Sequence, residues 1–92
     1  MRVQAEVSLY PLRTGTLSGP IAAFCEILRL HGLDVQIRSM STFAAGESSD
    51  LFEAFQEGFE QLAQENELVM SVKISNACPN GAEHDAEIER VD

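Results

Sequence analysis

Three short stretches of this sequence carry side chains that could recognise a small polar molecule. The first alternates an acid, a hydroxyl and a phenol along an extended segment, the second is a Ser-Thr pair, and the third is a Ser-Asn pair. The residues are Glu6, Ser8, Tyr10, Ser41, Thr42, Ser75 and Asn76. Carboxylate, hydroxyl and amide groups are donors and acceptors of hydrogen bonds. Groups of this kind can contact a small polar ligand, but their types and spacing alone do not define a site.

The same residues do not form a recognisable catalytic set. Acid–base or nucleophilic catalysis needs a nucleophile or base beside a second titratable group. His31 and His84 stand alone, and Cys25 and Cys78 lack the spacing of a disulfide framework or a metal site. The sequence therefore predicts no catalytic residue, no metal ligand and no cofactor. Glu6 is the one acid among the residues named above.

The strands that must position these residues are visible as a period of two. Segments 3–10, 33–38 and 68–75 alternate apolar and polar residues, as expected for strands with one buried face. Segment 41–46 is a short extended stretch, and we expect it to pair antiparallel with the strand before it.

Two further segments have apolar residues at helical spacing. The first begins at the expected N-cap Ser18 and ends at Gly32, which fits the C′ position of a helix. The second begins at the expected N-cap Ser49 or Asp50 and contains Gly58. A glycine inside a helix costs about 1 kcal/mol relative to alanine, so its presence predicts close packing at that point.

The resulting order β-α-β-β-α-β is that of a ferredoxin-like split sandwich. We therefore predict an α+β fold with one antiparallel sheet and both helices on one face. The other face of the sheet is expected to remain open and largely polar. Its residues are Gln4, Glu6, Ser8, Tyr10, Gln36, Arg38, Met40, Ser71, Lys73 and Ser75.

An open sheet face has two interpretations. An antiparallel sheet can leave one face in water, so the face could be an ordinary solvated surface. Its mixture of Tyr10, Met40 and Val69 with charged and hydroxyl groups favours instead a second subunit that packs on it and encloses a polar pocket. A core of 92 residues is small, and association is a usual remedy.

Simpler roles remain open for the individual residues. Glu6 could pair with Arg38 or Lys73 across the sheet. The hydroxyl pair at 41–42 could form a turn. Asn76 could bond to its own backbone where the last strand ends.

Length and charge exclude several classes of function. The chain has 92 residues and a net charge of −9. Nucleic acid and anionic membranes are bound by Lys and Arg, so neither is an expected partner. Because residues 1–6 lack the apolar stretch of a secretory signal, we expect a cytoplasmic protein. We expect one domain over 1–79 and an acidic tail over 80–92.

Four stretches, taken in order, resemble the thiamine- and hydroxymethylpyrimidine-binding family of small prokaryotic proteins, often called YkoF-like. The stretches are 5–12, 32–35, 40–42 and 75–79. The resemblance runs from Val3 to Pro79 and leaves out the predicted tail.

The resemblance implies a non-catalytic subunit that pairs strands into dimers, and often forms tetramers. It implies that the ligand is thiamine or its hydroxymethylpyrimidine moiety. The exocyclic NH₂ and ring nitrogens of an aminopyrimidine could be met by Glu6 and Asn76, while Tyr10 or Phe43 could stack on the ring. The matched motif positions are Glu6, Ser8, Ser41, Thr42, Ser75 and Asn76.

Two functions of other classes stay open at this point. One is a small enzyme on a dimeric ferredoxin-like scaffold. The other is a protein-interaction module, whose contact surface would be the acidic second half of the chain. A rise in melting temperature with thiamine or its precursor would favour binding over both.

Overall fold

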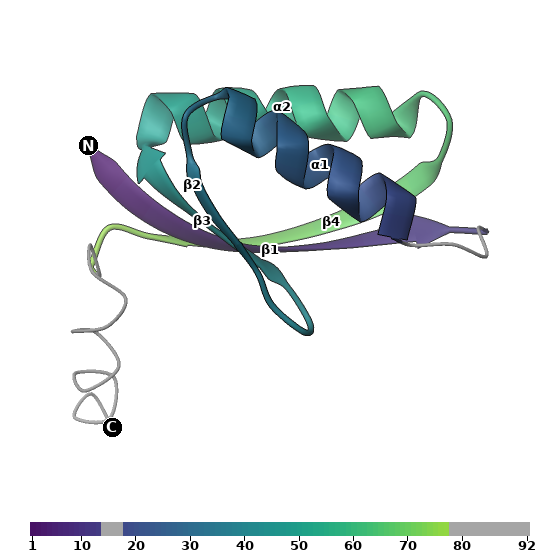
Figure 1. The fold of residues 1–92 in the computed structure, drawn as a ribbon, viewed down its shortest axis with the longest axis horizontal. Helices are drawn as coiled ribbons and strands as arrows, with labels where there is room; N and C mark the ends of the chain where they lie inside the picture. The colour runs from purple at the N-terminus through teal and green to yellow at the C-terminus, as the bar shows by residue number, and fades with distance from the viewer. Residues whose placement is uncertain (14–17, 78–92) are drawn as a thin grey trace.

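Six elements follow one another in the predicted order in the computed structural model of the chain (Figure 1). They are β1 (Arg2–Leu12), α1 (Ser18–Leu30), β2 (Asp34–Ile37), β3 (Thr42–Glu47), α2 (Ser48–Ala63) and β4 (Glu67–Ser75). The structure describes residues 1–13 and 18–77. The predicted tail over 80–92 lies outside the described residues.

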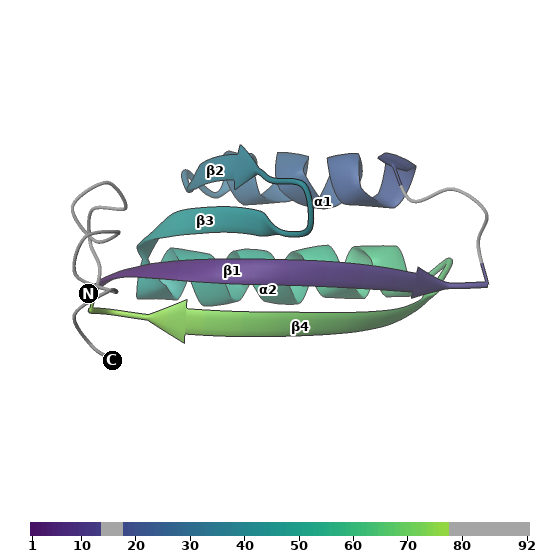
Figure 2. The ribbon, with the colours of Figure 1, turned by 90° about the horizontal axis from the view of Figure 1, so that it is seen from below.

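The strands form one antiparallel sheet in the order β2-β3-β1-β4 (Figure 2). Both helices cover the same face of this sheet (Figure 1). This is the ferredoxin-like α+β fold, so the predicted architecture is confirmed. The central strand β1 is the longest and pairs with β4 along most of its length.

The core lies between the sheet and the two helices. Val3, Ala5 and Val7 on β1 point toward the helices and are buried. Phe24 of α1 stacks on Phe55 of α2, with the ring centroids 6.0 Å apart. The packing follows the sequence pattern, because the buried β1 residues are the apolar members of the alternating run.

Gly58 lies where α2 packs closely against Phe24 of α1. A Cβ atom placed on Gly58 would lie 2.6 Å from Cδ1 of Phe24, well inside van der Waals contact. The close packing predicted from this glycine is confirmed. The cost of this glycine to the helix is offset, because any larger residue at position 58 would clash with the Phe24 ring.

Helix α1 ends at a glycine in the left-handed region, as predicted. Gly32 has φ +83° and donates its N–H to the carbonyl of Arg29 at 2.9 Å. Leu33 donates to the carbonyl of Leu28 at 3.3 Å. Together these bonds form a Schellman motif.

The predicted helix starts were wrong. Ser18 is the first residue of α1 and not its cap. Helix α2 begins at Ser48, and its N-cap is Glu47, whose side chain makes no capping bond. The reason is that β3 passes directly into α2 without a loop. The Ser48 N–H therefore donates to the carbonyl of Met1, the residue just before β1, at 2.8 Å.

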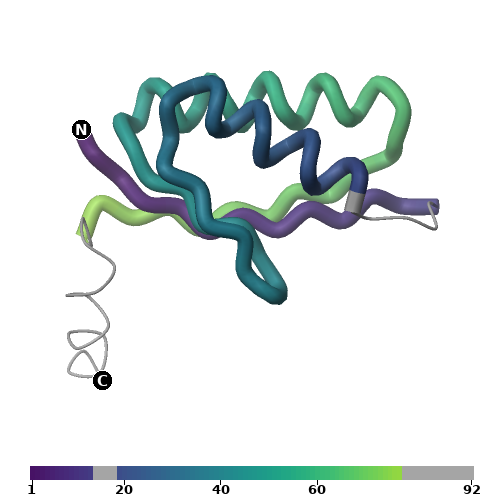
Figure 3. The backbone as a smooth tube through the Cα atoms, in the orientation of Figure 1, coloured from purple at the N-terminus to yellow at the C-terminus, as the bar shows by residue number. Residues whose placement is uncertain are grey.

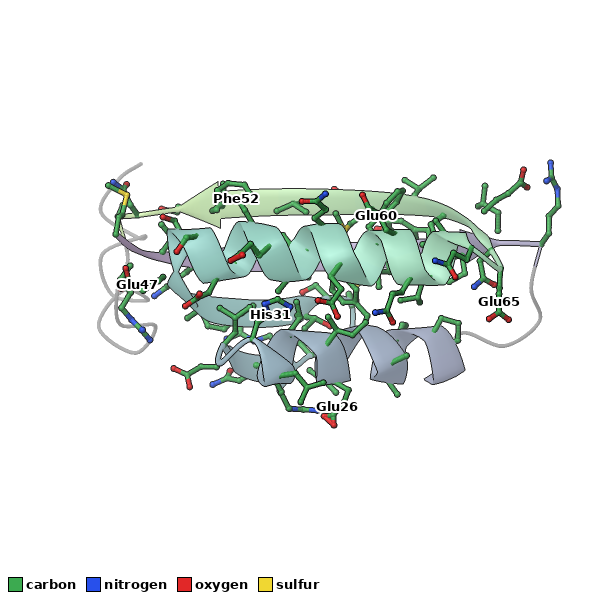
Figure 4. All side chains as sticks on the ribbon, turned by 90° about the horizontal axis from the view of Figure 1, so that it is seen from above. Glu26, His31, Glu47, Phe52, Glu60 and Glu65 are labelled. Atoms are coloured by element: carbon green, nitrogen blue, oxygen red, sulfur yellow. The ribbon has the colours of Figure 1, made fainter. Side chains whose placement is uncertain are left out.

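The edge strand β4 is covered only partly by the helices. Val72 and Ile74 are partly exposed, although they share the helix-facing row with Leu68 and Met70. Phe52 is 59% exposed on the side of α2 nearest β4 (Figure 4). In the described part of the chain, neither helix is long and apolar enough to span a bilayer.

Candidate ligand cavity

A cavity of about 250 Å³ lies where β1 runs past the end of β3. Its walls come from β1, from the hairpin between β2 and β3, and from Ile21 and Phe24 of α1. The cavity brings together hydroxyl-bearing residues from two of the predicted stretches. They are Ser8, Tyr10, Ser41 and Thr42.

The cavity exists because β1 is longer than its neighbour. The pairing of β1 with β3 ends at Val7, opposite Thr42, whereas its pairing with β4 continues to Leu12 (Figure 2). The β2–β3 hairpin bends away from the helices at this point (Figure 3). Pro11 is tolerated in β1 because the strand has become an edge there.

Glu6 lies beside the cavity and is connected to it through Ser41. The Ser41 hydroxyl donates to Oε2 of Glu6 at 3.1 Å. Phe43 and Lys73 are its neighbours in the register on either side. Among the described residues Glu6 forms no ion pair with Lys73 or Arg38, so the carboxylate remains near the cavity as a hydrogen-bond acceptor.

Arg38 lines the cavity and reaches across the open face. Its guanidinium lies 4.7 Å from the centroid of the Phe43 ring and donates to Oε1 of Gln36 at 3.1 Å. One face of Phe43 is therefore occupied by a cation. Tyr10, which is 52% exposed and lines the cavity, is the aromatic ring better placed to stack on a ligand.

Ser8 and Thr42 already have partners within the chain. The Ser8 hydroxyl donates to the carbonyl of Met40 at 3.3 Å. Thr42 is only 6% exposed, and its Oγ1 lies 3.7 Å from Sγ of the buried Cys25. Thr42 thus contributes to the inner wall of the cavity and ties β3 to α1.

Ser75 and Asn76 lie at the other end of the sheet. Ser75 is opposite Gln4 in the register, whereas Ser8 at the cavity is opposite Ser71. At about 3.3 Å per residue, the two ends of this stretch are separated by more than the length of a pyrimidine. The Ser75 hydroxyl accepts from the N–H of Ala77 at 3.0 Å. One chain does not bring this third stretch to the cavity.

The comparison with protein families gives a match over nearly the whole chain. The model described as "Thiamine-binding protein" matches residues 5–91. This chain belongs to the thiamine-binding protein family. The match extends beyond Pro79, where the sequence resemblance ended, into the segment predicted as a tail.

Solved structures similar to this thiamine-binding family member support the fold. A hypothetical protein from Methanocaldococcus jannascii is 23% identical with a TM-score of 0.78, over 98% of this chain and 95% of that chain. A Thermotoga maritima protein, provisionally described as a thiamine biosynthesis/salvage protein, is 17% identical with a TM-score of 0.79, over 96% and 99%. A Streptococcus pneumoniae protein is 21% identical with a TM-score of 0.77, over 97% and 99%.

At these identities the three likenesses establish the fold of the thiamine-binding family member and nothing about its ligand. The comparison with curated protein sequences gives no significant match.

The cavity also has walls that the sequence interpretation missed. Ile21 and Phe24 belong to the apolar stripe of the first predicted helix, and Arg38 was expected on the open face. The signal that could have found them is the order of the elements, because the helix after β1 must start near the end of β1. Leu9, which also lines the cavity, was not singled out in the sequence.

A second hollow, of about 420 Å³, lies over the outward face of α2. None of the predicted site residues reaches it. Its walls are amides, carboxylates and one imidazole, that of His31 (Figure 4). His31 Nε2 lies 2.8 Å from Oε1 of Glu57. Within the described residues no three His, Cys, Asp or Glu side chains form a group that could hold a metal ion.

Proposed function

We propose that this protein binds thiamine or its hydroxymethylpyrimidine moiety in the cavity beside β1, without changing the ligand chemically. The observation that carries the proposal is the meeting of Ser8, Tyr10 and Ser41 around one cavity, with Glu6 one hydrogen bond away. Membership in the thiamine-binding protein family supports the choice of ligand.

The size of the cavity favours a single ring. Sites for drug-sized ligands occupy about 300–1,000 Å³, and this cavity has about 250 Å³. The pyrimidine ring with its small substituents suits that volume better than a complete diphosphorylated ligand. We therefore expect the pyrimidine to enter the cavity and the remainder of a larger ligand to lie outside.

The groups around the cavity match the chemistry of that ring. Glu6 can accept a hydrogen bond from an amine and can stabilise a positive charge on the ring or on the thiazolium. Tyr10 offers an exposed ring for stacking or for contact with a cation. Hydroxyls such as that of Ser41 can turn to donate or to accept.

A thermal-shift experiment tests the proposal. Hydroxymethylpyrimidine and thiamine should each raise the melting temperature, because a ligand at 100 times its Kd adds about 2.7 kcal/mol to the free energy of unfolding. Mass spectrometry should recover the ligand unchanged after incubation. An unmoved melting curve at millimolar concentrations of both compounds would show that this is not the ligand class.

Replacing the carboxylate should weaken binding without unfolding the protein. Glu6→Gln keeps an acceptor for Ser41 but removes the charge, so we expect a Kd at least tenfold higher, which corresponds to about 1.4 kcal/mol. Glu53→Gln is the matched control, since Glu53 is an exposed carboxylate on α2, away from the cavity. Calorimetric titration measures both variants. Equal affinities for the two would remove Glu6 from the site.

We also propose that a second copy of this chain covers the mouth of the cavity. Three apolar side chains around the mouth are exposed: Tyr10 at 52%, Met40 at 89% and Val69 at 49%. Tyr10 and Met40 line the cavity, and Val69 is opposite Tyr10 on β4. A polar pocket enclosed by such a patch is what the sequence predicts for a subunit interface.

Light scattering tests this second copy. The native chain should have the mass of a dimer or a tetramer, and Val69→Lys should lower it because a charge is buried without a partner. Leu30→Lys is the control, since Leu30 is 78% exposed on α1, away from the mouth of the cavity. A native chain that is monomeric at all concentrations would contradict the shared site.

A further inference from the structure

The alternation of hydrogen-bonded and non-hydrogen-bonded pairs in the sheet determines the direction in which the backbone N–H and C=O groups of β1 point at the cavity. In an antiparallel pair, residues that exchange hydrogen bonds alternate with residues that do not. The Arg38 N–H donates to the carbonyl of Ser41 at 2.8 Å, which makes these two the last bonded pair of the β2–β3 hairpin. The next pair, Ile37 and Thr42, is therefore a non-hydrogen-bonded pair. The backbone N–H and C=O of Thr42 consequently point away from β2 and toward β1.

The opposite end of the β1–β3 pair independently gives the same alternation of bonded and non-bonded residues. The Ser48 N–H donates to the carbonyl of Met1 at 2.8 Å, and these residues are opposite each other when the register is extended by one position. Val7 and Thr42 lie an even number of positions further along, so they also form a bonded pair. The backbone N–H and C=O of Val7 thus point toward β3.

The backbone N–H and C=O of Leu9 point the same way as those of Val7, because the direction of these groups alternates from one residue to the next along a strand. Extending the register would place Met40 opposite Leu9, but Met40 lies in the hairpin turn and outside β3. Within the described residues, Leu9 forms no backbone hydrogen bond to the hairpin. The hydrogen bond to the Met40 carbonyl comes from the Ser8 hydroxyl and not from the Leu9 N–H.

Pro11 is consistent with this phase. It is two positions beyond Leu9 and therefore faces the same side, where a residue without an N–H loses no ladder bond. The next polar backbone groups on that side of β1 are those of Leu9. Leu9 lines the cavity and its side chain packs on the core. Because its backbone groups point toward the hairpin that forms the facing wall, we infer that they face the cavity. Among the described residues none bonds to these groups, and a polar backbone group without a partner at a half-buried residue is costly unless something binds it.

We propose that the backbone of Leu9 recognises the edge of a planar amino-heteroaromatic ring that occupies the place β3 has left. The Leu9 N–H donates to a ring nitrogen, and its C=O accepts from the exocyclic NH₂ on the adjacent carbon. A ring bound in this way lies in the plane of the sheet, edge-on to β1. This inference rests on the proposed function and specifies the chemical group that the cavity reads.

The consequence is a requirement for the amino group itself. Side chains such as Glu6 could be satisfied by any cation or donor, whereas the Leu9 carbonyl is left unpaired by a ring that lacks the NH₂. A site built to bond a donor rejects the analogue without it strongly. We expect the analogue 5-hydroxymethyl-2-methylpyrimidine, which lacks only the amino group, to bind at least tenfold more weakly than hydroxymethylpyrimidine.

Nuclear magnetic resonance of the full chain, labelled with ¹⁵N, tests the inference. Hydroxymethylpyrimidine should move the Leu9 amide proton downfield and slow its exchange with solvent at least tenfold. Tyr10 is the internal control, because its amide faces β4 opposite Val69 and should keep its exchange rate. The analogue without the amino group should leave the Leu9 amide close to its free position.

The outcomes separate this inference from the function on which it rests. Binding of hydroxymethylpyrimidine with an unchanged Leu9 amide would overturn the backbone contact and leave the proposed function intact. Equal affinity for the two pyrimidines would also overturn it. Failure of hydroxymethylpyrimidine to bind at all would overturn both.

Discussion

Phe24→Ala is expected to lower the free energy of unfolding by about 3–5 kcal/mol. Phe24 is fully buried, stacks on Phe55 and lies against Gly58 of the facing helix. Its removal leaves a void that these neighbours fill only partly, so lost contacts add to the lost burial. A domain of this size has only about 5–14 kcal/mol of stability in total, so this single change removes a large part of it.

Chemical denaturation of Phe24→Ala and of Phe52→Ala measures this effect. Phe52 is the matched control because it is the same residue type in the other helix, 59% exposed on the side of α2 nearest β4. Its truncation should change the stability by less than about 0.5 kcal/mol. Comparable losses for the two variants would mean that the helices do not pack on the sheet through Phe24.

Gly58→Ala is expected to change sign with the residue at position 24. In the native chain the added Cβ would lie 2.6 Å from the Phe24 ring, so overpacking should outweigh the gain in helix propensity and destabilise the protein by about 1–2 kcal/mol. In the Phe24→Ala background the obstruction is gone. The same substitution should then stabilise the protein by about 1 kcal/mol.

A double-mutant cycle measures this coupling. Gly19→Ala is the control, because a Cβ at Gly19 in the first turn of α1 meets nothing within 4 Å. It should be neutral or slightly stabilising in both backgrounds. Additive effects of the changes at 24 and 58 would show that the close approach of the two helices is absent in solution.

The fold was predictable because its signals are local. The alternation in 3–10 and 68–75 identifies strands without knowledge of their partners. Gly32 indicates the end of a helix, because glycine readily adopts the left-handed conformation found there. The helix starts were wrong where a tertiary contact replaced a local one. Ser49 and Asp50 are good caps by residue type, but the carbonyl of Met1 satisfies the first N–H of α2 instead.

The predicted site was distributed by the fold into different places. Ser8, Tyr10 and Ser41 meet at the cavity, and Glu6 reaches it through Ser41. Thr42 turns inward to Cys25 because it is on the helix-facing side of β3. Ser75 and Asn76 lie at the far end of β4, and only a second subunit could bring such a stretch to a cavity. They stay predictions.

The sequence by itself determined the order of the elements, the buried face of each and the polar character of the open face. These follow from periodicity, which depends only on neighbours along the chain. The tertiary structure alone decided that the pairing of β1 with β3 ends at Thr42, where β3 begins, while β1 continues to Leu12. That difference in extent is a matter of register between distant segments, and it leaves both the cavity and a Leu9 backbone that forms no hydrogen bond to the β2–β3 hairpin.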